Sequence, residues 1–414
     1  MLDTCFIGID VSSKSNVVHV MDKNGDKLWA DTFFNSLEGT NKLLNRLRND
    51  ENCKDSFLVF GLEATGIYGK GLAMTLGETS LIPKSQKTVK VLNPKQVKRF
   101  HSSYSDLPKD DFTDAFVIAD SLRFGRIAAK ETLMQDKYLA LQHLTRWRYQ
   151  TAHEITREKN RYLQNLFLKF SAMSQQHATS EALFSNTFGA TAMDLVNDFY
   201  DIDQIAYMPL NELVDYLVVH GKNHFTDPEA IAKEVQKAAR ASYRLPKTVQ
   251  DSVNQVLAMQ TQTIKFYQDQ LKAVDKMIEK QMAVIPNTLT SIPGIGPVYA
   301  SGLIAEIGDV NRFENEASLA KYAGLTWKRH QSGDYESSNK KLIPGGNKFL
   351  RYYFCQAANK VRLHDPDYAS YYNSKLKEVR KTPHKRALVL TARKLVRLVY
   401  VLLRDGKLYQ LQHK

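Results

Sequence analysis

Four acidic residues near the N-terminus have the types and positions needed to hold a divalent metal. Asp10 and Glu63 each end an apolar run typical of a buried strand, and Asp111 and Asp114 lie three residues apart in KDDFTDAFVIAD. Hard cations such as Mg²⁺ prefer oxygen ligands. Two such ions can stabilise the attacking and leaving oxygens of a phosphodiester displacement. These carboxylates therefore predict a site for two Mg²⁺ ions, with Mn²⁺ as a substitute, that acts on a phosphodiester.

Each of these residues also has an ordinary interpretation. Asp10 could form a turn at a strand end, Glu63 could cap the next helix, and the aspartates of KDDFTDAFVIAD could complement a helix dipole. Ordinary folding, however, gives no reason to gather four like charges. A bound cation turns their mutual repulsion into ligation.

The elements around these carboxylates predict an α/β domain over residues 1–127. An Asn-Gly hairpin signal joins the second and third expected strands, and Ser36 is a candidate cap for the first helix. We expect strands at Phe6 to Asp10, Asn16 to Met21, Lys27 to Phe34, Ser56 to Leu62 and Val89 to Leu92, and helices at Leu37 to Leu47 and Asp111 to Phe124. A three-strand meander followed by alternating helices and strands is typical of the ribonuclease H-like fold.

The middle of the chain, residues 128–286, predicts a helical arm. Residues 134–170 and 249–284 are polar and rich in helix-forming residues, so each predicts one long helix. The two could pair as an antiparallel coiled coil, which serves as a spacer or a dimerisation device. The segment between them, 174–243, contains short helical patterns and no interpretable motif.

Residues 287–414 predict a mainly α-helical domain. Its opening, SIPGIGPVYASG, resembles the turn of a helix-hairpin-helix. Gly294 and Gly296 would there let backbone N–H groups approach phosphate oxygens without a Cβ in the way. A plain turn between helices is the alternative.

The positive charge of the chain is concentrated near its C-terminus. The net charge is +13, yet residues 321–414 carry 21 Lys and Arg against 6 Asp and Glu. A basic domain beside a carboxylate-bearing one suggests a polyanion held by one and cut by the other. Lys340, Lys341, Lys348 and Arg351 are candidate phosphate contacts, with a solvated basic surface as the alternative.

Other features bear on the surroundings of the protein. Cys5, Cys53 and Cys355 are too few and scattered for a disulfide framework or a zinc cluster. No stretch approaches the roughly 18 apolar residues of a membrane span, and the N-terminus lacks a signal-peptide layout. We therefore expect no membrane association and a cytoplasmic location.

We expect the Ser332 hydroxyl to be accessible, because the residue that follows it, Gly333, has no side chain to cover it. A Ser-Gly pair is far more often a turn than a nucleophile. No Ser-His-Asp grouping surrounds Ser332 in the sequence, so these residues alone do not make it catalytic.

The motifs, taken in order, resemble a known family. GIDVSSKSN, GLEATG, VLNPKQVKRF with KDDFTDAFVIAD, SIPGIGPVYASGLIAEIGDVNRF, AKYAGLTWKRHQSG, GNKFLRYYF and ARKLVRLVYVLL resemble the DEDD transposases of bacterial insertion sequences, the insertion sequence one-ten family. The resemblance covers both ends of the chain and implies a domain like the junction resolvase RuvC, followed by a C-terminal transposase domain.

The resemblance also implies roles and partners. It makes Asp10, Glu63, Asp111 and Asp114 the metal-binding tetrad and Ser332 a nucleophile that forms a 5′-phosphoserine link. It implies donor and target DNA as substrates, a structured non-coding bridge RNA as guide, a homodimer or homotetramer, and a place on the bacterial nucleoid when active. Delegating sequence recognition to base pairing suits a protein without recognisable base-reading modules.

One departure from the family pattern leaves the ligand set open. Lys109-Asp110-Asp111 stands where the family has Lys-Thr-Asp, so Asp110 is a possible substitute for Asp111. The rival functions are a junction-resolving or RNA-processing nuclease that uses water, an actin-like sugar kinase, and a non-catalytic nucleic-acid binder. An actin-like sugar kinase needs further glycine-rich phosphate loops, and this sequence does not contain them.

Overall fold

The structure is a computed structural model of the 414-residue chain. It describes residues 3–63, 66–104, 107–125, 135–180, 182–327, 331–332, 335–336, 342, 345–378 and 382–410. The chain divides into two compact units, Met1–Asp136 with Gly308–Leu319 and Lys137–Ile307 with Ala320–Lys414. The division of the sequence at residues 127 and 286 stays a prediction.

The first unit is built on a mixed five-stranded sheet in the order β3-β2-β1-β4-β5. β1 pairs antiparallel with β2 and β2 with β3, whereas β1, β4 and β5 run parallel. The strands are β1 Thr4–Val11, β2 Ser15–Met21, β3 Lys27–Phe34, β4 Phe57–Glu63 and β5 Lys87–Leu92. This meander followed by a parallel extension confirms the expected α/β class and is consistent with a ribonuclease H-like fold.

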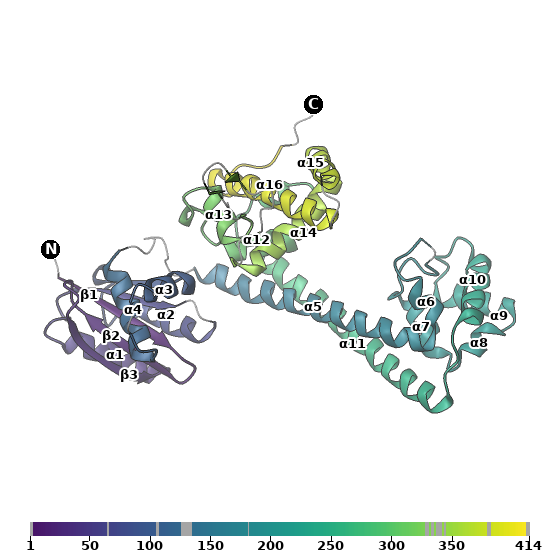
Figure 1. Cartoon of the computed structure of the whole chain (residues 1–414), viewed down its shortest axis with the longest axis horizontal. Coiled ribbons are helices and arrows are strands. Elements are labelled where there is room, and N and C mark those ends of the chain that lie inside the picture. The colour runs from purple at the N-terminus through teal and green to yellow at the C-terminus, as the bar shows by residue number, and fades with distance from the viewer. Residues whose placement is uncertain are drawn as a thin grey trace. The chain divides into compact units, whose positions relative to one another are not determined.

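Helices cover both faces of this sheet (Figure 1). They are α1 Leu37–Asn49, α2 Tyr68–Glu78, α3 Pro94–His101 and α4 Asp111–Arg123, with a 3-10 turn η1 at Lys84–Gln86. Leucines of α1 and α2 pack with Ile7, Ile9 and Phe60 on one face. Val117, Ile118 and Leu122 of α4 pack with Val59 on the other. Because successive strand residues point to opposite faces, each strand of the centre contributes to both cores.

Local sequence explains how these elements begin and turn. Asp22 accepts hydrogen bonds from the backbone N–H groups of Asn24, Gly25 and Asp26, each at 2.9 Å, and Gly25 has φ +96°. A side-chain acceptor and a left-handed glycine are what a tight hairpin needs. Ser36 caps α1 by accepting from Gly39 N at 3.1 Å. The predicted hairpin and cap are therefore confirmed.

Two long helices form an arm in the second unit (Figure 1). α5 spans Asp136–Lys169 and α11 spans Lys247–Met282. Arg148 of α5 pairs with Asp275 of α11 at 2.6 Å, and further along Asn165 bonds Gln260 at 3.1 Å. The residue numbers rise on one helix as they fall on the other, so the pair is antiparallel, as predicted. Coiled-coil packing between the two helices stays a prediction.

The segment between the two arm helices is a small helical cluster. Its helices are α6 Ser171–Gln175, α7 Ala190–Asp198, α8 Ile202–Ala206, α9 Leu210–His220 and α10 Pro228–Ala241. Their apolar residues share one core with Leu166 of α5 and Leu257 of α11. Lys169, the last residue of α5, donates from Nζ to the carbonyl oxygens of Val196 and Phe199, each at 2.6 Å. The short helical patterns of the sequence thus belong to a cap that closes one end of the arm.

The C-terminal region is largely helical, as predicted. Its elements are η2 Leu289–Ser291, α12 Pro297–Ile307, η3 Val310–Arg312, α13 Glu316–Tyr322, β6 Gln331–Ser332, β7 Tyr335–Glu336, α14 Lys348–His364, α15 Pro366–Lys377 and α16 Pro383–Asp405. No described helix is long and apolar enough to cross a membrane.

The expected helix-hairpin-helix is only partly correct. The turn leads into α12, but the element before it is the single 3-10 turn η2 rather than a helix. Pro286 and Pro293 flank this turn. Proline removes a backbone donor, and the residue before a proline avoids helical geometry. Pro293 therefore limits the segment after Pro286 to a short turn.

Candidate active site

Asp10 and Glu63 occupy adjacent positions on neighbouring parallel strands. The register between β1 and β4 pairs Ile9 with Leu62, so the two carboxylates follow directly at the ends of the paired strands. Both strands run in the same direction, and their carboxyl ends meet at one edge of the sheet. The sheet thus brings together two residues that lie far apart in the sequence.

The same face of the sheet carries α4 directly above these strands. A Cβ on Gly8 would collide with the backbone of α4 at Ala115 and Ala119, and one on Gly61 would lie 2.5 Å from Leu122 Cδ1. Asp10 and Glu63 follow these glycines by two residues and therefore point to the same face. The missing side chains let α4 approach closely enough for its first turn to share a site with both carboxylates.

That first turn of α4 carries Asp111 and Asp114. Their three-residue separation places them on neighbouring positions of one helix face. His101, the last residue of α3, has its Nε2 3.8 Å from Asp114 Oδ1. The structure therefore brings all four predicted carboxylates to one edge of the first unit and adds a histidine that sequence reasoning missed.

The pKa values of Asp10 and Glu63 are both raised, because the two carboxyls are partly buried and lie near other acidic side chains. Burial, and after it the charges of Asp111 and Asp114, together raise the pKa of Asp10 to about 6. Burial, and after it the charges of Asp10 and Asp114, likewise raise the pKa of Glu63 to about 7. Like charges in a partly desolvated place disfavour ionisation. A cation at this edge would relieve this repulsion.

Asp110, unlike Asp111, has its side chain engaged at the start of α4. Its side chain accepts from Thr113 N at 2.7 Å and is the N-cap of α4. This hydrogen bond lowers the pKa of Asp110. The carboxylate is therefore engaged in starting the helix, which favours Asp111 as the candidate ligand.

The donor set fits a hard divalent cation. Carboxylate oxygens are the ligands that Mg²⁺ and Mn²⁺ accept. Among the residues that the structure describes, no three His, Cys, Asp or Glu side chains lie together in a way that could hold a metal ion. The fit to a cation is therefore one of donor type, and not of a formed coordination site.

Ser332 lies in the second unit, in the two-residue strand β6, which pairs with β7 through the register Ser332 to Tyr335. Its chain enters this hairpin after Trp327, which bridges to Leu342. The predicted nucleophile is therefore placed on a β-hairpin loop between α13 and α14.

The two glycines of the predicted phosphate turn differ in their surroundings. Gly294 has φ +89°, and a Cβ there would lie 2.9 Å from the carbonyl oxygen of Lys360. Gly296 has open space around it, immediately before α12 begins at Pro297. Gly294 therefore serves close packing against α14, and Gly296 alone leaves backbone open to a phosphate.

The basic residues predicted to contact phosphate also differ in how available their side chains are. Lys348 is exposed at the start of α14 with its Nζ 5.0 Å from the centre of the Phe349 ring. Arg351 donates from Nη1 to the Gly345 carbonyl oxygen at 3.0 Å, so part of its guanidinium holds the chain. Lys340 and Lys341 lie outside the described residues. Lys348 is thus the more available of the two described candidates.

A row of arginines on α16 was missed by sequence reasoning. Arg386, Arg393 and Arg397 are spaced seven and four residues apart, so they share one face of the helix. Within the described part of the chain, none of the three side chains has a hydrogen-bond or ion-pair partner. Their spacing in HKRALVLTARKLVRLVYVLL was the signal that could have revealed this face.

Comparison with known proteins finds a match near each end of the chain. Residues 7–170 match a transposase family model of the DEDD type found in IS110 elements, and residues 287–373 match the model described as "Transposase IS116/IS110/IS902 family". Together the two matches cover more than half of the chain.

Individual relatives extend the likeness. The chain is 24% identical to the "Insertion element IS116 uncharacterized 44.8 kDa protein" of Streptomyces clavuligerus, over 98% of this chain and 96% of that protein. It is 29% identical to the "Transposase for insertion sequence element IS1111A" of Coxiella burnetii, over 35% and 38%. It is 27% identical to the "Pilin gene-inverting protein" of Moraxella bovis, over 35% and 46%.

These matches identify the chain as a transposase, an enzyme that acts on DNA, and the fold of the first unit is consistent with this class. The chain belongs to the IS110 family, with a DEDD domain at its N-terminus and the second transposase domain of that family near its C-terminus.

Proposed function

We propose that this transposase cuts and rejoins DNA strands to move an insertion sequence, using Asp10, Glu63, Asp111 and Asp114 to bind divalent metal and Ser332 as nucleophile. The observation that carries the proposal is the adjacency of Asp10 and Glu63 beneath the first turn of α4, with the pKa of both carboxyls raised. Structural needs alone do not explain this concentration of negative charge.

The four carboxylates and Ser332 have separate roles in the proposed reaction. The carboxylates hold the cation, which when bound supplies charge stabilisation to a phosphodiester. The Ser332 Oγ attacks phosphorus, loses its proton, and forms an Oγ–P bond as the P–O3′ bond breaks and the released 3′-oxygen takes up a proton. A different 3′-hydroxyl later reverses this step and restores the serine. Bond energy is conserved in the 5′-phosphoserine link, so strands are exchanged without ATP.

The partners follow from the charge of the chain and from its family. Donor and target DNA are the substrates, and residues 321–414, with 21 basic residues, supply phosphate contacts. Arg386, Arg393 and Arg397 are added to the candidates for this role, together with Lys348 and Gly296. A structured bridge RNA reads the sequences by pairing, and the protein works as a homodimer or homotetramer on Mg²⁺ or Mn²⁺.

A junction-resolving nuclease that uses metal-activated water is the second candidate. One observation favours it: the four carboxylates all come from the first compact unit, which has what such a nuclease needs without Ser332. This function predicts cleavage that does not depend on the serine.

Recombination between donor and target plasmids tests the proposal. The protein is co-expressed with the non-coding flanks of its own element, in wild-type form and as Asp10→Ala, Ser332→Ala and the control Ser252→Ala on α11. Denatured samples are probed for covalent protein–DNA adducts. We expect recombination to fail in the first two variants only, with the adduct absent from Ser332→Ala. Cleavage that persists in Ser332→Ala would establish the water-using nuclease instead. Recombination in the absence of the non-coding flanks would show that the protein does not need an RNA guide.

A further inference from the structure

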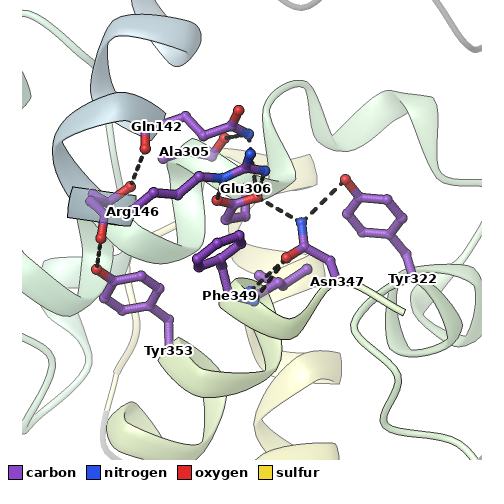
Figure 2. Close-up of polar contacts among 10 residues, drawn as sticks. Gln142, Arg146, Ala305, Glu306, Tyr322, Asn347, Phe349 and Tyr353 are labelled. Atoms are coloured by element: carbon purple, nitrogen blue, oxygen red, sulfur yellow. Dashed lines mark hydrogen bonds and ion pairs between the residues drawn. The ribbon is translucent and has the colours of Figure 1, made fainter. Parts of the chain in front are cut away.

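Glu306 is a fully buried carboxylate at the end of α12, far in sequence from the residues that surround it. Its side chain has 0% exposure. Arg146 of the arm helix α5 donates to it twice, from Nε to Oε1 at 2.7 Å and from Nη2 to Oε2 at 2.9 Å. Gln142, one turn earlier on α5, donates to Oε2 at 3.2 Å. Figure 2 shows the carboxylate at the centre of these contacts.

The fourth contact of Glu306 comes from the residue that starts α14. Asn347 donates from Nδ2 to Glu306 Oε2 at 2.6 Å. Its Oδ1 accepts from Phe349 N and Leu350 N, both at 3.0 Å, and so caps α14. Because the cap needs the amide oxygen, the amide nitrogen is turned toward the carboxylate. One side chain thus joins the helix start to the buried charge.

Asn347 also belongs to the neck of the loop that carries Ser332. Its backbone N–H donates to the Tyr322 carbonyl oxygen at 2.6 Å. Gly324 and Gly346 pack backbone to backbone in left-handed conformations, at φ +70° and +79°. Residues 322–324 and 345–347, which we call the neck of the loop, therefore lie against each other, and Asn347 bonds across them.

Further contacts tie the arm to the same helix start. The Arg146 guanidinium lies 4.6 Å from the centre of the Phe349 ring. Tyr353 donates from its hydroxyl to the Thr145 carbonyl oxygen at 2.6 Å. α5 is thus docked on the first turns of α14 by charge, stacking and hydrogen bonding together.

We propose that Glu306 is a positioning residue that fixes the neck of the Ser332 loop against the arm helix α5. The inference rests on the proposed role of Ser332 for its effect on catalysis, and on the contacts above for its effect on structure. A buried ion pair seldom adds stability over an apolar substitute, and its best-attested use is to select one arrangement. Here the arrangement selected is that of a reactive loop relative to the arm.

A reciprocal exchange separates positioning from simple stability. Glu306→Gln removes the charge that holds Arg146, and Asn347→Asp sets two carboxylates against each other while keeping a helix cap. In the double variant, the amide of residue 306 donates to the carboxylate of residue 347, and one negative charge remains beside Arg146. Asp275→Asn is the matched control, because it breaks the Arg148 pair between α5 and α11 without touching the loop.

The first readout is formation of the covalent protein–DNA adduct in a single turnover, with DNA affinity and melting temperature measured alongside. We expect each single variant to slow adduct formation by about 10- to 100-fold, the range that a small misplacement of a reactive group produces. The double variant should recover most of that rate, and Asp275→Asn should lower only the melting temperature. A double variant no faster than the slower single variant overturns the proposal.

The second readout does not depend on chemistry. Hydrogen exchange at the amides of residues 345–350 should speed up in both single variants and return toward wild type in the double variant, with α11 unchanged. Unaltered exchange at these amides in Glu306→Gln overturns the inference even if catalysis changes. If wild type forms no adduct but the exchange pattern holds, the nucleophile assignment fails and the positioning of the neck stands.

Discussion

Ala115 of α4 lies directly on Gly8 of β1, so closely that a methyl group on the glycine would collide with the Ala115 carbonyl oxygen. This contact sets the height of α4 above the sheet. Since Asp10 follows Gly8 and Asp114 precedes Ala115, the contact also sets how near the carboxylates of strand and helix come to each other.

Gly8→Ala should therefore damage the site more than its size suggests. Overpacking of a close contact costs about 1 to 3 kcal/mol, and α4 would move outward with its aspartates. We expect a lower melting temperature and a loss of strand cleavage larger than the loss of folded protein. Gly71→Ala on α2 is the control, because open space surrounds that glycine and alanine in a helix is favourable by up to about 1 kcal/mol. Equal effects of the two variants would contradict this account.

The stability of the metal-free protein should fall as pH rises through the range set by Asp10 and Glu63. Their pKa values are raised from 3.8 to about 6 and from 4.5 to about 7. The folded state therefore binds protons more tightly than the unfolded state, and this contribution is present at low pH and lost between about pH 4 and 7.

Removing the two charges should reveal this effect. The variant Asp10→Asn with Glu63→Gln should melt higher than wild type at pH 8, by a shift on the order of a few degrees, and with little difference at pH 4. Mg²⁺ should raise the melting temperature of wild type and not of the variant. The measurement is thermal unfolding at both pH values with and without metal, and a wild type that melts higher than the variant at pH 8 without metal contradicts it.

Substitutions of Asp110 and of Asp111 should have different effects, the first on stability and the second on cleavage. Asp110→Ala loses the N-cap of α4 and should cost about 1 kcal/mol of stability, whereas Asp110→Ser keeps a capping oxygen and should cost less. Both should retain metal-dependent cleavage. Asp111→Asn should lose cleavage with little change in melting temperature. Cleavage that survives Asp111→Asn but not Asp110→Ser would exchange the two assignments.

The arginine face of α16 should affect DNA binding and not folding. Changing Arg386, Arg393 and Arg397 to Gln should weaken DNA affinity and reduce the slope of log affinity against log salt by about 2 to 3, since each phosphate contact releases counterions. Arg157→Gln on α5 is the control, an exposed arginine paired with Glu154. A triple variant with the salt slope of wild type would show that this face is merely solvated.

Much of the architecture was readable from the chain because it depends on local interactions. The turn around Asn24, the Ser36 cap and the long periodic helices of the arm are set by neighbours within a few residues. Apolar runs ending in Asp10 and Glu63 likewise indicated strands whose ends bear charge, and the family motifs supplied roles for them and for Ser332.

Other features were decided only by tertiary contacts. The cap that Asp110 gives to α4 is local, but Asp111 comes near Asp10 only because α4 packs against β1. Gly294 looked like an opening for phosphate, but the backbone of α14 fills the space beside it.

Glu306 shows the limit most clearly. In the sequence it is one charge inside the apolar run GLIAEIG, with nothing nearby to indicate a partner. Its partners Arg146 and Asn347 stand 160 and 41 residues away. The sequence by itself determined the elements and the kinds of side chain available, because short-range periodicity and turn chemistry specify these. Which distant residues share a buried charge was decided only when the helices packed, since burial and pairing are properties of the folded chain.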